Sequence, residues 1–155
     1  MQHFRFCSPD KKGQKHRGMA VVEFALVVPV LISLLLGIVE FGLLVRDNLT
    51  LANAAREGAR SGSLGSKQDQ IKARVTSAAA PLNLTAAKAG RIDIEQSLDN
   101  GITYTAIPPD MASSNGVPQG AMLRVTAVNR HQSLTGFFPF INNRIISGSA
   151  TFRKE

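Results

Sequence analysis

The hydrophobic positions divide the chain into one long apolar run near the N-terminus and a longer region of mixed character. No residue from Phe24 to Val39 is charged, and the run extends over residues 19–45 with only Glu23 and Glu40 inside it. A membrane-spanning helix needs about 20 mostly apolar residues. The pattern therefore predicts a single transmembrane helix over residues 19–45.

Several positions within the predicted span bear on its shape and contacts. Pro29 removes one backbone donor, which predicts a mild kink. Gly37 and Gly42 allow a second helix to approach closely, so they are candidates for subunit contact. Glu40 follows Met19 by 21 residues, about 31 Å along a helix. We therefore expect Glu40 at the outer interface of the bilayer, in water rather than buried.

The helical period continues beyond the span on a more polar background. Small and apolar residues recur at the spacing of one helix face: Leu51, Ala54, Ala55 and Gly58. Glu57 and Arg60 are three residues apart and can form an ion pair. The turn-rich residues 61–66 are expected to end this helix. A second, short helix is predicted from about Lys67 to Ala80, stopped by Pro81.

After residue 90 the pattern changes to that of strands. Four segments between turn signals are predicted to be strands: residues 91–97, 102–107, 122–129 and 145–153. Asp99-Asn100-Gly101 indicates a hairpin between the first two. In the third segment the two faces alternate: Leu123, Val125 and Ala127 against Met122, Thr126 and Val128. The expected fold class is α+β, with a long N-terminal membrane-spanning helix, a short second helix and an antiparallel sheet of about four strands.

The distribution of charge predicts which end of the span lies in the cytoplasm. The net charge is +7, and residues 1–18 hold five basic residues against Asp10 alone. Basic residues beside a span stay on the cytoplasmic side. We therefore predict a basic cytoplasmic leader over residues 1–18, disordered because it is polar and aperiodic, and an extracytoplasmic domain over residues 46–155. Since the leader accounts for much of the basic character, no nucleic-acid partner is expected.

The inventory of reactive side chains argues against an enzyme. Cys7 is the only cysteine, so neither a disulfide nor a cysteine metal site can form within one chain. His131 is the only histidine after the span and is expected at the surface or at a strand end. Asp93 and Glu95 share a strand face that should be exposed to solvent, with no nucleophile placed beside them. No catalytic residue, cofactor or metal is expected.

Three phenylalanines form a cluster late in the chain: Phe137, Phe138 and Phe140. Packing against the core beneath a loop is the first interpretation. A contact patch for a neighbouring subunit is the alternative, because exposed apolar clusters mark interfaces.

Glu23 is out of place in a membrane helix, where a carboxylate costs about 2.5–3.5 kcal/mol at the centre. It stands at the fifth place after Gly18, counting Met19 as the first, and Phe24 follows at the sixth. This arrangement resembles the processing site of type IV prepilins. The strings RGMAVVEFALVVP (17–29), GIVEFG (37–42) and AAREGAR (54–60) resemble one family in particular, the TadE-like pseudopilins of the tight-adherence (Flp pilus) system.

This resemblance implies a precursor in the bacterial inner membrane, with the C-terminal domain in the periplasm. A prepilin peptidase would cut after Gly18, so Gly18, Met19, Glu23 and Phe24 form the processing site. Glu23 would then meet the N-terminal amine of an adjacent subunit, with Pro29, Gly37 and Gly42 on the contact surface of the span. The implied partners are other pilins or pseudopilins and inner-membrane assembly proteins, and the implied role is pilus biogenesis, surface adhesion and biofilm formation.

Two alternatives stay open at this point. A pseudopilin of a type II secretion or DNA-uptake machine shares the glycine and glutamate signal but has other partners. A membrane-anchored binding domain would keep its N-terminus uncut. A TadF-like role and a place in the fibre outside the cell are also compatible with the sequence.

Overall fold

The computed structural model describes residues 14–84, 89–107 and 117–155. The chain divides into two units, one ending at Val39 and the other beginning at Glu40. The first unit contains the apolar run, and the second contains both helical and strand elements. The two units are described in turn.

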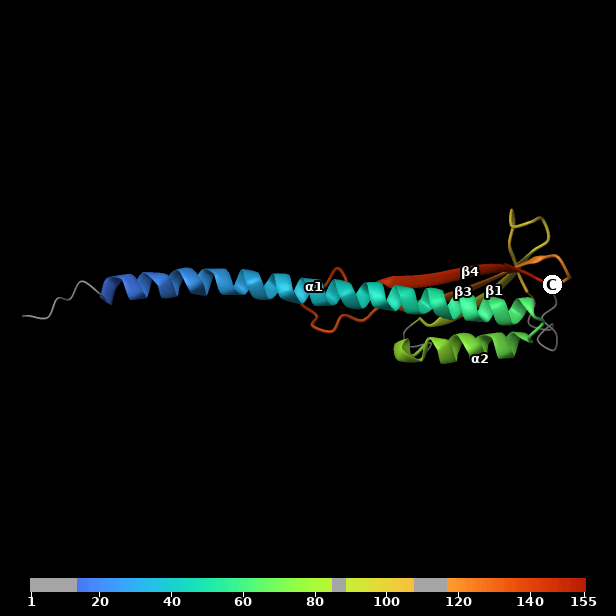
Figure 1. The fold of residues 1–155 in the computed structure, drawn as a ribbon, viewed down its shortest axis with the longest axis horizontal. Helices are drawn as coiled ribbons and strands as arrows, with labels where there is room; N and C mark the ends of the chain where they lie inside the picture. The colour runs from blue at the N-terminus through green and yellow to red at the C-terminus, as the bar shows by residue number, and fades with distance from the viewer. Residues whose placement is uncertain (1–13, 85–88, 108–116) are drawn as a thin grey trace, which may run out of the picture. The chain divides into compact units, whose positions relative to one another are not determined.

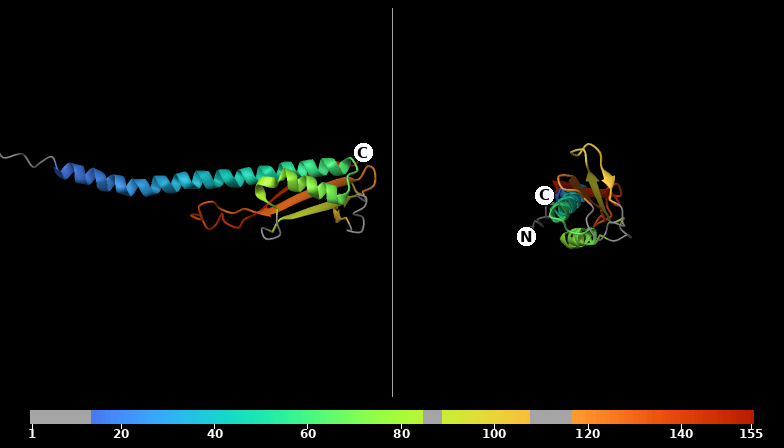
Figure 2. Two further views of the ribbon diagram at one scale, coloured as in Figure 1. Left: turned by 90° about the horizontal axis from the view of Figure 1, so that it is seen from below. Right: turned by 90° about the vertical axis from the view of Figure 1, so that its right-hand side faces the viewer.

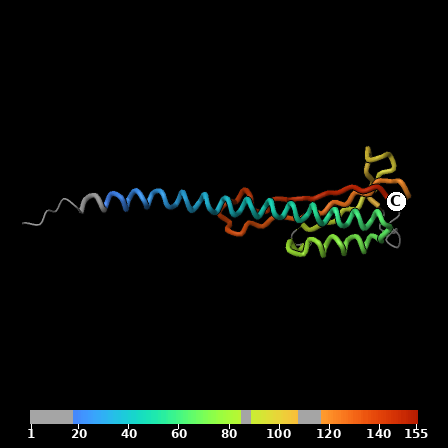
Figure 3. The backbone as a smooth tube through the Cα atoms, viewed as in Figure 1, coloured from blue at the N-terminus to red at the C-terminus, as the bar shows by residue number. Residues whose placement is uncertain are grey.

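Helix α1 (Gln14–Ser63) is a single helix of 50 residues. Figure 3 shows its backbone as an unbroken coil from residue 18 onward. The prediction that residues 1–18 are disordered is wrong for residues 14–18, which are helical. Residues 1–13 lie outside the described part of the chain. Because α1 begins before Gly18, the leader and the span share one helix.

The first unit presents its apolar side chains outward. From Gly18 to Val39 none is buried, and Phe24, Leu26 and Ile38 are each more than half exposed. α1 stays helical through Pro29 and curves gently in this part (Figure 2), and the Ser33 hydroxyl donates to the Pro29 carbonyl at 2.7 Å. The helix is long and apolar enough to cross a bilayer, so it fits a single-pass membrane protein.

The second unit has two layers, with helices on one face of an antiparallel sheet (Figures 1 and 2). The later part of α1 lies beside α2 (Gln68–Ala78), which is followed by a 3-10 turn, η2 (Ala80–Leu82). The sheet has the order β2-β1-β3-β4. Its strands are β1 (Arg91–Ser97), β2 (Thr105–Ala106), β3 (Met122–Arg130) and β4 (Ile145–Arg153). The predicted α+β class is confirmed.

The alternation predicted for the third strand puts one face of β3 against the helices. Leu123, Val125 and Ala127 are fully buried, while the residues between them are half-buried. From α1, the predicted stripe supplies Leu51, Ala54 and Ala55, all fully buried. The core therefore lies between the sheet and the two helices, and the period of each element decides which side chains enter it.

Glycines let the layers approach closely. A Cβ on Gly62 would meet the side chains of Leu123 and Ile71, and a Cβ on Gly148 in β4 would meet the backbone of Leu51 and Ala52 in α1. In the first case side chains fill the place of a Cβ. In the second, a strand lies directly against a helix backbone, with no room for a side chain between them.

The β1–β2 connection differs from the predicted short hairpin. β2 contains only Thr105 and Ala106, and the loop before it is held by Asp99. The Asp99 carboxylate accepts hydrogen bonds from the Ser97 hydroxyl at 2.6 Å and from the Thr103 amide at 2.9 Å. These bonds take the place of the hydrogen bonds between β1 and β2 that a longer β2 would make. The second strand therefore begins at Thr105 rather than at residue 102, where the sequence predicted it.

Candidate assembly and processing site

The four residues of the predicted processing site lie on the N-terminal part of α1. Gly18, Met19, Glu23 and Phe24 are all exposed. Met19 and Glu23 are four residues apart, and this spacing puts them on one face of the helix. A Cβ on Gly18 would meet nothing within 4 Å. Helix α1 thus presents these side chains outward, and their role in processing stays a prediction.

The predicted subunit-contact positions follow along the same helix. Pro29 and Gly42 are exposed, Gly37 is half-buried, and a Cβ on Gly42 would meet nothing within 4 Å. Exposed small residues leave the helix backbone open to a neighbouring helix. Whether these positions make subunit contacts stays a prediction.

Glu40 does not have the environment that its place in the sequence predicts. Its side chain is fully buried in the second unit, where Oε1 accepts a hydrogen bond from the Leu134 amide at 2.9 Å and Oε2 accepts one from the Thr135 hydroxyl at 3.3 Å. The prediction that this carboxylate is exposed to water is wrong, and its place at the bilayer interface stays a prediction. The β3–β4 connection can bury Glu40 because the backbone of that connection donates a hydrogen bond to the carboxylate.

A second polar contact joins α1 to the same connection. His131 follows β3 directly, so it lies at a strand end, one of the two predicted places, and it is buried rather than at the surface. Its Nδ1 lies 2.7 Å from Oδ2 of Asp47, and Oδ1 of Asp47 accepts from Nη2 of Arg46 at 2.9 Å. Asp47 is seven residues after Glu40, so both carboxylates lie on the helix face that turns toward the sheet.

The phenylalanine cluster lies on this connection, and the expectation of core packing is wrong. Phe137 and Phe140 are exposed, and Phe138 is half-buried. The rings touch edge to face, with centroids 5.1 Å apart for Phe137 and Phe138 and 5.6 Å apart for Phe138 and Phe140. The alternative interpretation, a surface that makes contact with something else, is therefore the one that remains.

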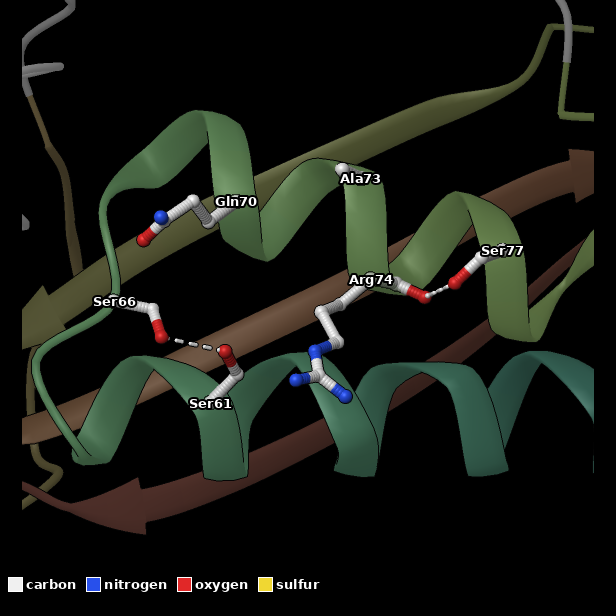
Figure 4. Close-up of a pocket in the computed structure, with 6 residues that line it drawn as sticks. All are labelled: Ser61, Ser66, Gln70, Ala73, Arg74 and Ser77. Carbon is white, nitrogen blue, oxygen red and sulfur yellow. Dashed lines mark hydrogen bonds between the residues drawn. The ribbon is translucent and has the colours of Figure 1, made fainter.

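An open, polar groove of about 560 Å³ lies between the end of α1 and α2 (Figure 4). The Ser61 hydroxyl donates to that of Ser66 at 2.7 Å across its end. Arg74 extends from α2 toward α1, where it pairs with Glu57 at 3.3 Å. The ion pair expected between Glu57 and Arg60 is thus replaced by one between the two helices. Such exposed pairs contribute little to stability. The groove is therefore a polar contact between the two helices that adds little to the stability of the fold.

Other charged residues also find partners on the sheet. Asp93 pairs with Arg91 at 2.8 Å, and Glu95 pairs with Arg124 at 2.6 Å. Both carboxylates are half-buried rather than fully solvated as expected. Within the described ranges, no group of three or more histidine, cysteine, aspartate or glutamate side chains could hold a metal ion.

Comparison with known proteins identifies the N-terminal segment. The family model described as TadE-like protein matches residues 18–60. Residues 18–60 are TadE-like. The match begins at Gly18 and continues through Glu23 to the end of the string at 54–60, so it covers the residues that carry the sequence resemblance. Neither a curated protein nor a solved structure matches the chain significantly.

The TadE-like segment ends within the last turn of α1, so the match does not include α2 or the sheet. This match suggests involvement in tight-adherence pilus assembly and interaction with its components. The buried carboxylates Glu40 and Asp47 fall inside the matched segment. Sequence reasoning missed their role, although one signal was present: both lie on the apolar stripe of α1 with Leu44 and Leu51.

Proposed function

We propose that this protein is a minor pilin-like subunit, a pseudopilin, that supports biogenesis of a tight-adherence pilus and thereby surface adhesion and biofilm formation. Its role is structural rather than enzymatic. The observation that carries the proposal is the TadE-like match, which begins at Gly18 and includes Glu23 on an exposed, apolar helix. A carboxylate kept in such a run needs a specific reason, because it is costly in lipid.

Maturation by a prepilin peptidase, with a cut after Gly18, is the first step of this role. Gly18 lies inside α1, so the helix must unwind locally before the peptide bond can enter a peptidase in extended form. Glycine lowers the cost of unwinding, since it is about 1 kcal/mol less favourable in a helix than alanine. Its missing side chain also lets the peptidase approach the backbone.

Assembly through the span is the second step. After the cut, Met19 carries a free amine, and Glu23 lies about 6 Å further along the helix axis. An unpaired carboxylate in lipid favours a nearby cation, and the amine of an adjacent subunit can supply it. The exposed Gly42 and the half-buried Gly37 offer places where neighbouring helices can approach. The proposed partners are other pilins or pseudopilins and inner-membrane assembly proteins.

Mass spectrometry of the protein extracted from membranes tests the proposal. In cells with the peptidase the N-terminus should be Met19, and in cells without it the precursor should remain. An N-terminus at Met1 despite an active peptidase would overturn the pseudopilin assignment in favour of an uncut membrane anchor.

The proposed location is the bacterial inner membrane, with the N-terminus in the cytoplasm and the second unit in the periplasm. A reporter enzyme that works only outside the cytoplasm, fused after Glu155, should be active. The matched fusion of a reporter that works only in the cytoplasm should be inactive. The opposite pair of results would contradict the proposed orientation.

A further inference from the structure

The connection between β3 and β4 presents apolar side chains that the second unit does not cover. We call residues 132–143 the aromatic loop. Leu134 is 73% exposed, Phe140 is 69% exposed and Phe137 is 54% exposed. Contiguous exposed apolar residues mark sites of interaction with another molecule or with a membrane.

The aromatic loop is held in shape by hydrogen bonds at its neck. The His131 amide donates to the Arg144 carbonyl at 2.8 Å, and the Asn143 amide donates to the His131 carbonyl at 3.0 Å. Within the loop, the Ile141 amide donates to the Phe138 carbonyl at 3.1 Å. A closed neck and internal turns are features of compact surface loops, so the exposed rings are presented by an ordered backbone.

The aromatic loop is attached to Glu40, the residue that ends the uncharged stretch of the apolar run. Glu40 accepts from the Leu134 amide and the Thr135 hydroxyl, and the Phe137 amide donates in turn to the Thr135 hydroxyl at 3.3 Å. Glu40 directly follows Val39, the last residue of the uncharged run. These bonds therefore hold the loop at the residue that ends the uncharged stretch of α1.

The composition of the aromatic loop suits the interface between lipid and water. It contains no acidic residue and is flanked by Arg130 and Arg144, the second of which is exposed. Aromatic side chains are enriched at the level of the lipid head groups. Basic side chains nearby are attracted to anionic head groups.

We propose that the aromatic loop inserts into the outer-leaflet interface of the membrane that α1 crosses, with Phe137 and Phe140 among the acyl chains. This inference rests on the proposed membrane insertion of α1. The loop then gives the second unit a contact with the bilayer beside the span. Glu40 acts as a positioning residue, because it fixes the backbone of the loop at the end of the uncharged stretch of α1.

Lipid quenching of a fluorescent label on the full chain tests this proposal. Cys7 is replaced by serine, and single cysteines are introduced in separate chains as Leu134→Cys, Ile102→Cys and Leu31→Cys, then labelled with an environment-sensitive fluorophore. Ile102 is the matched control, because it is 83% exposed on the β1–β2 loop. The chains are reconstituted in vesicles of phosphatidylethanolamine and phosphatidylglycerol that contain brominated acyl chains.

We expect lipid quenching at positions 31 and 134, and quenching by aqueous iodide at position 102. Adding Phe137→Ser with Phe140→Ser should abolish lipid quenching at position 134 and leave it unchanged at position 31. Both phenylalanines are exposed, so their replacement does not empty the core.

Three results would overturn the proposal. Iodide quenching at position 134 equal to that at position 102 would mean that the loop stays in water, while the proposed function would stand if position 31 is quenched by lipid. If position 134 were protected from both quenchers, and the protection grew as the protein-to-lipid ratio rose, a second copy of the chain would be covering the loop. Absence of lipid quenching at position 31 would remove the proposed span, and the loop inference with it.

Discussion

Nδ1 of His131 lies 2.7 Å from Oδ2 of Asp47, and both side chains are buried. A carboxylate can only accept, so the imidazole donates to it. The contact joins α1 to the residue that follows β3 and starts the β3–β4 connection. Removing either partner leaves the other polar group buried without this bond, which is costly.

A double-mutant cycle of Asp47→Ala and His131→Ala should give a coupling energy of about 1.5–3 kcal/mol, the range for hydrogen bonds to charged groups. The free energy of unfolding is measured on the full chain in micelles by pulse proteolysis in urea. The control cycle uses Arg91 and Asp93, a pair on β1 that is more exposed than Asp47 and His131, and we expect a coupling of no more than about 1 kcal/mol. Equal coupling in the two cycles would contradict a special role for the buried contact.

The second unit should fold without the span, with mixed helix and strand content by circular dichroism and no change on adding a chelator. A fragment of residues 40–155 retains the bonds from Glu40 to the β3–β4 connection, whereas a fragment of residues 46–155 lacks them. The shorter fragment should be less stable by at least about 1–3 kcal/mol, the cost of unsatisfied buried polar groups. A disordered spectrum for the longer fragment would refute this prediction.

Gly148→Ala should destabilise the second unit by about 1–3 kcal/mol, the usual cost of overpacking. The added methyl group would meet the backbone of Leu51 and Ala52, which cannot move aside as a flexible side chain can. Gly42→Ala is the matched control, because its Cβ would meet nothing within 4 Å. In an exposed helix this change should be neutral or stabilising by up to about 1 kcal/mol. Urea unfolding in micelles compares the two variants, and equal effects would argue against close contact at Gly148.

Acid should loosen the β1–β2 loop before the core. Hydrogen bonds from Ser97 and Thr103 hold the pKa of Asp99 well below its usual value. A lowered folded-state pKa stabilises the loop above the unfolded pKa of about 3.9, and the effect is lost as the pH falls toward the folded value. The protection factor of the Thr103 amide, which is the exchange rate of the unfolded chain divided by the rate measured by NMR at the same pH, should therefore fall at acidic pH. In the Asp99→Asn variant the exchange should show no such pH-dependent step, and a step in both proteins would assign it to another group.

Gly18→Leu should block processing and leave a precursor about 18 residues longer, because the side chain hinders both local unwinding and access to the backbone. Gly42→Leu is the matched control and should be cut normally. Glu23→Gln should leave insertion intact but impair assembly, because it removes the charge proposed to pair with the neighbouring amine. Mass spectrometry with a pilus or adherence assay separates these outcomes. Normal assembly of the Glu23→Gln protein would indicate that Glu23 merely lies at the cytoplasmic interface.

The sequence predicted the features that depend on local periodicity. A long, mostly apolar segment in lipid must satisfy its backbone by forming a helix, so a helical span was predicted over residues 19–45, and α1 is helical there. Alternation along residues 122–129 identified the buried face of β3, and the i, i+3, i+4 spacing identified the buried face of α1 at Leu51 and Ala54. Buried residues recur every 3.6 positions along a helix and every second position along a strand, so these patterns can be read from the sequence.

Tertiary structure decided where the polar residues of α1 go. Glu40 was expected in water because distance along one helix was the only measure available, and the β3–β4 connection that buries it comes more than 90 residues later in the chain. The partner of His131 was hidden for the same reason, since Asp47 is 84 residues away. The exposure of Phe137 and Phe140 likewise depends on which side of a loop faces the core. Hydrophobicity alone does not specify that choice, because an aromatic side chain is equally apolar in a core and at a membrane surface.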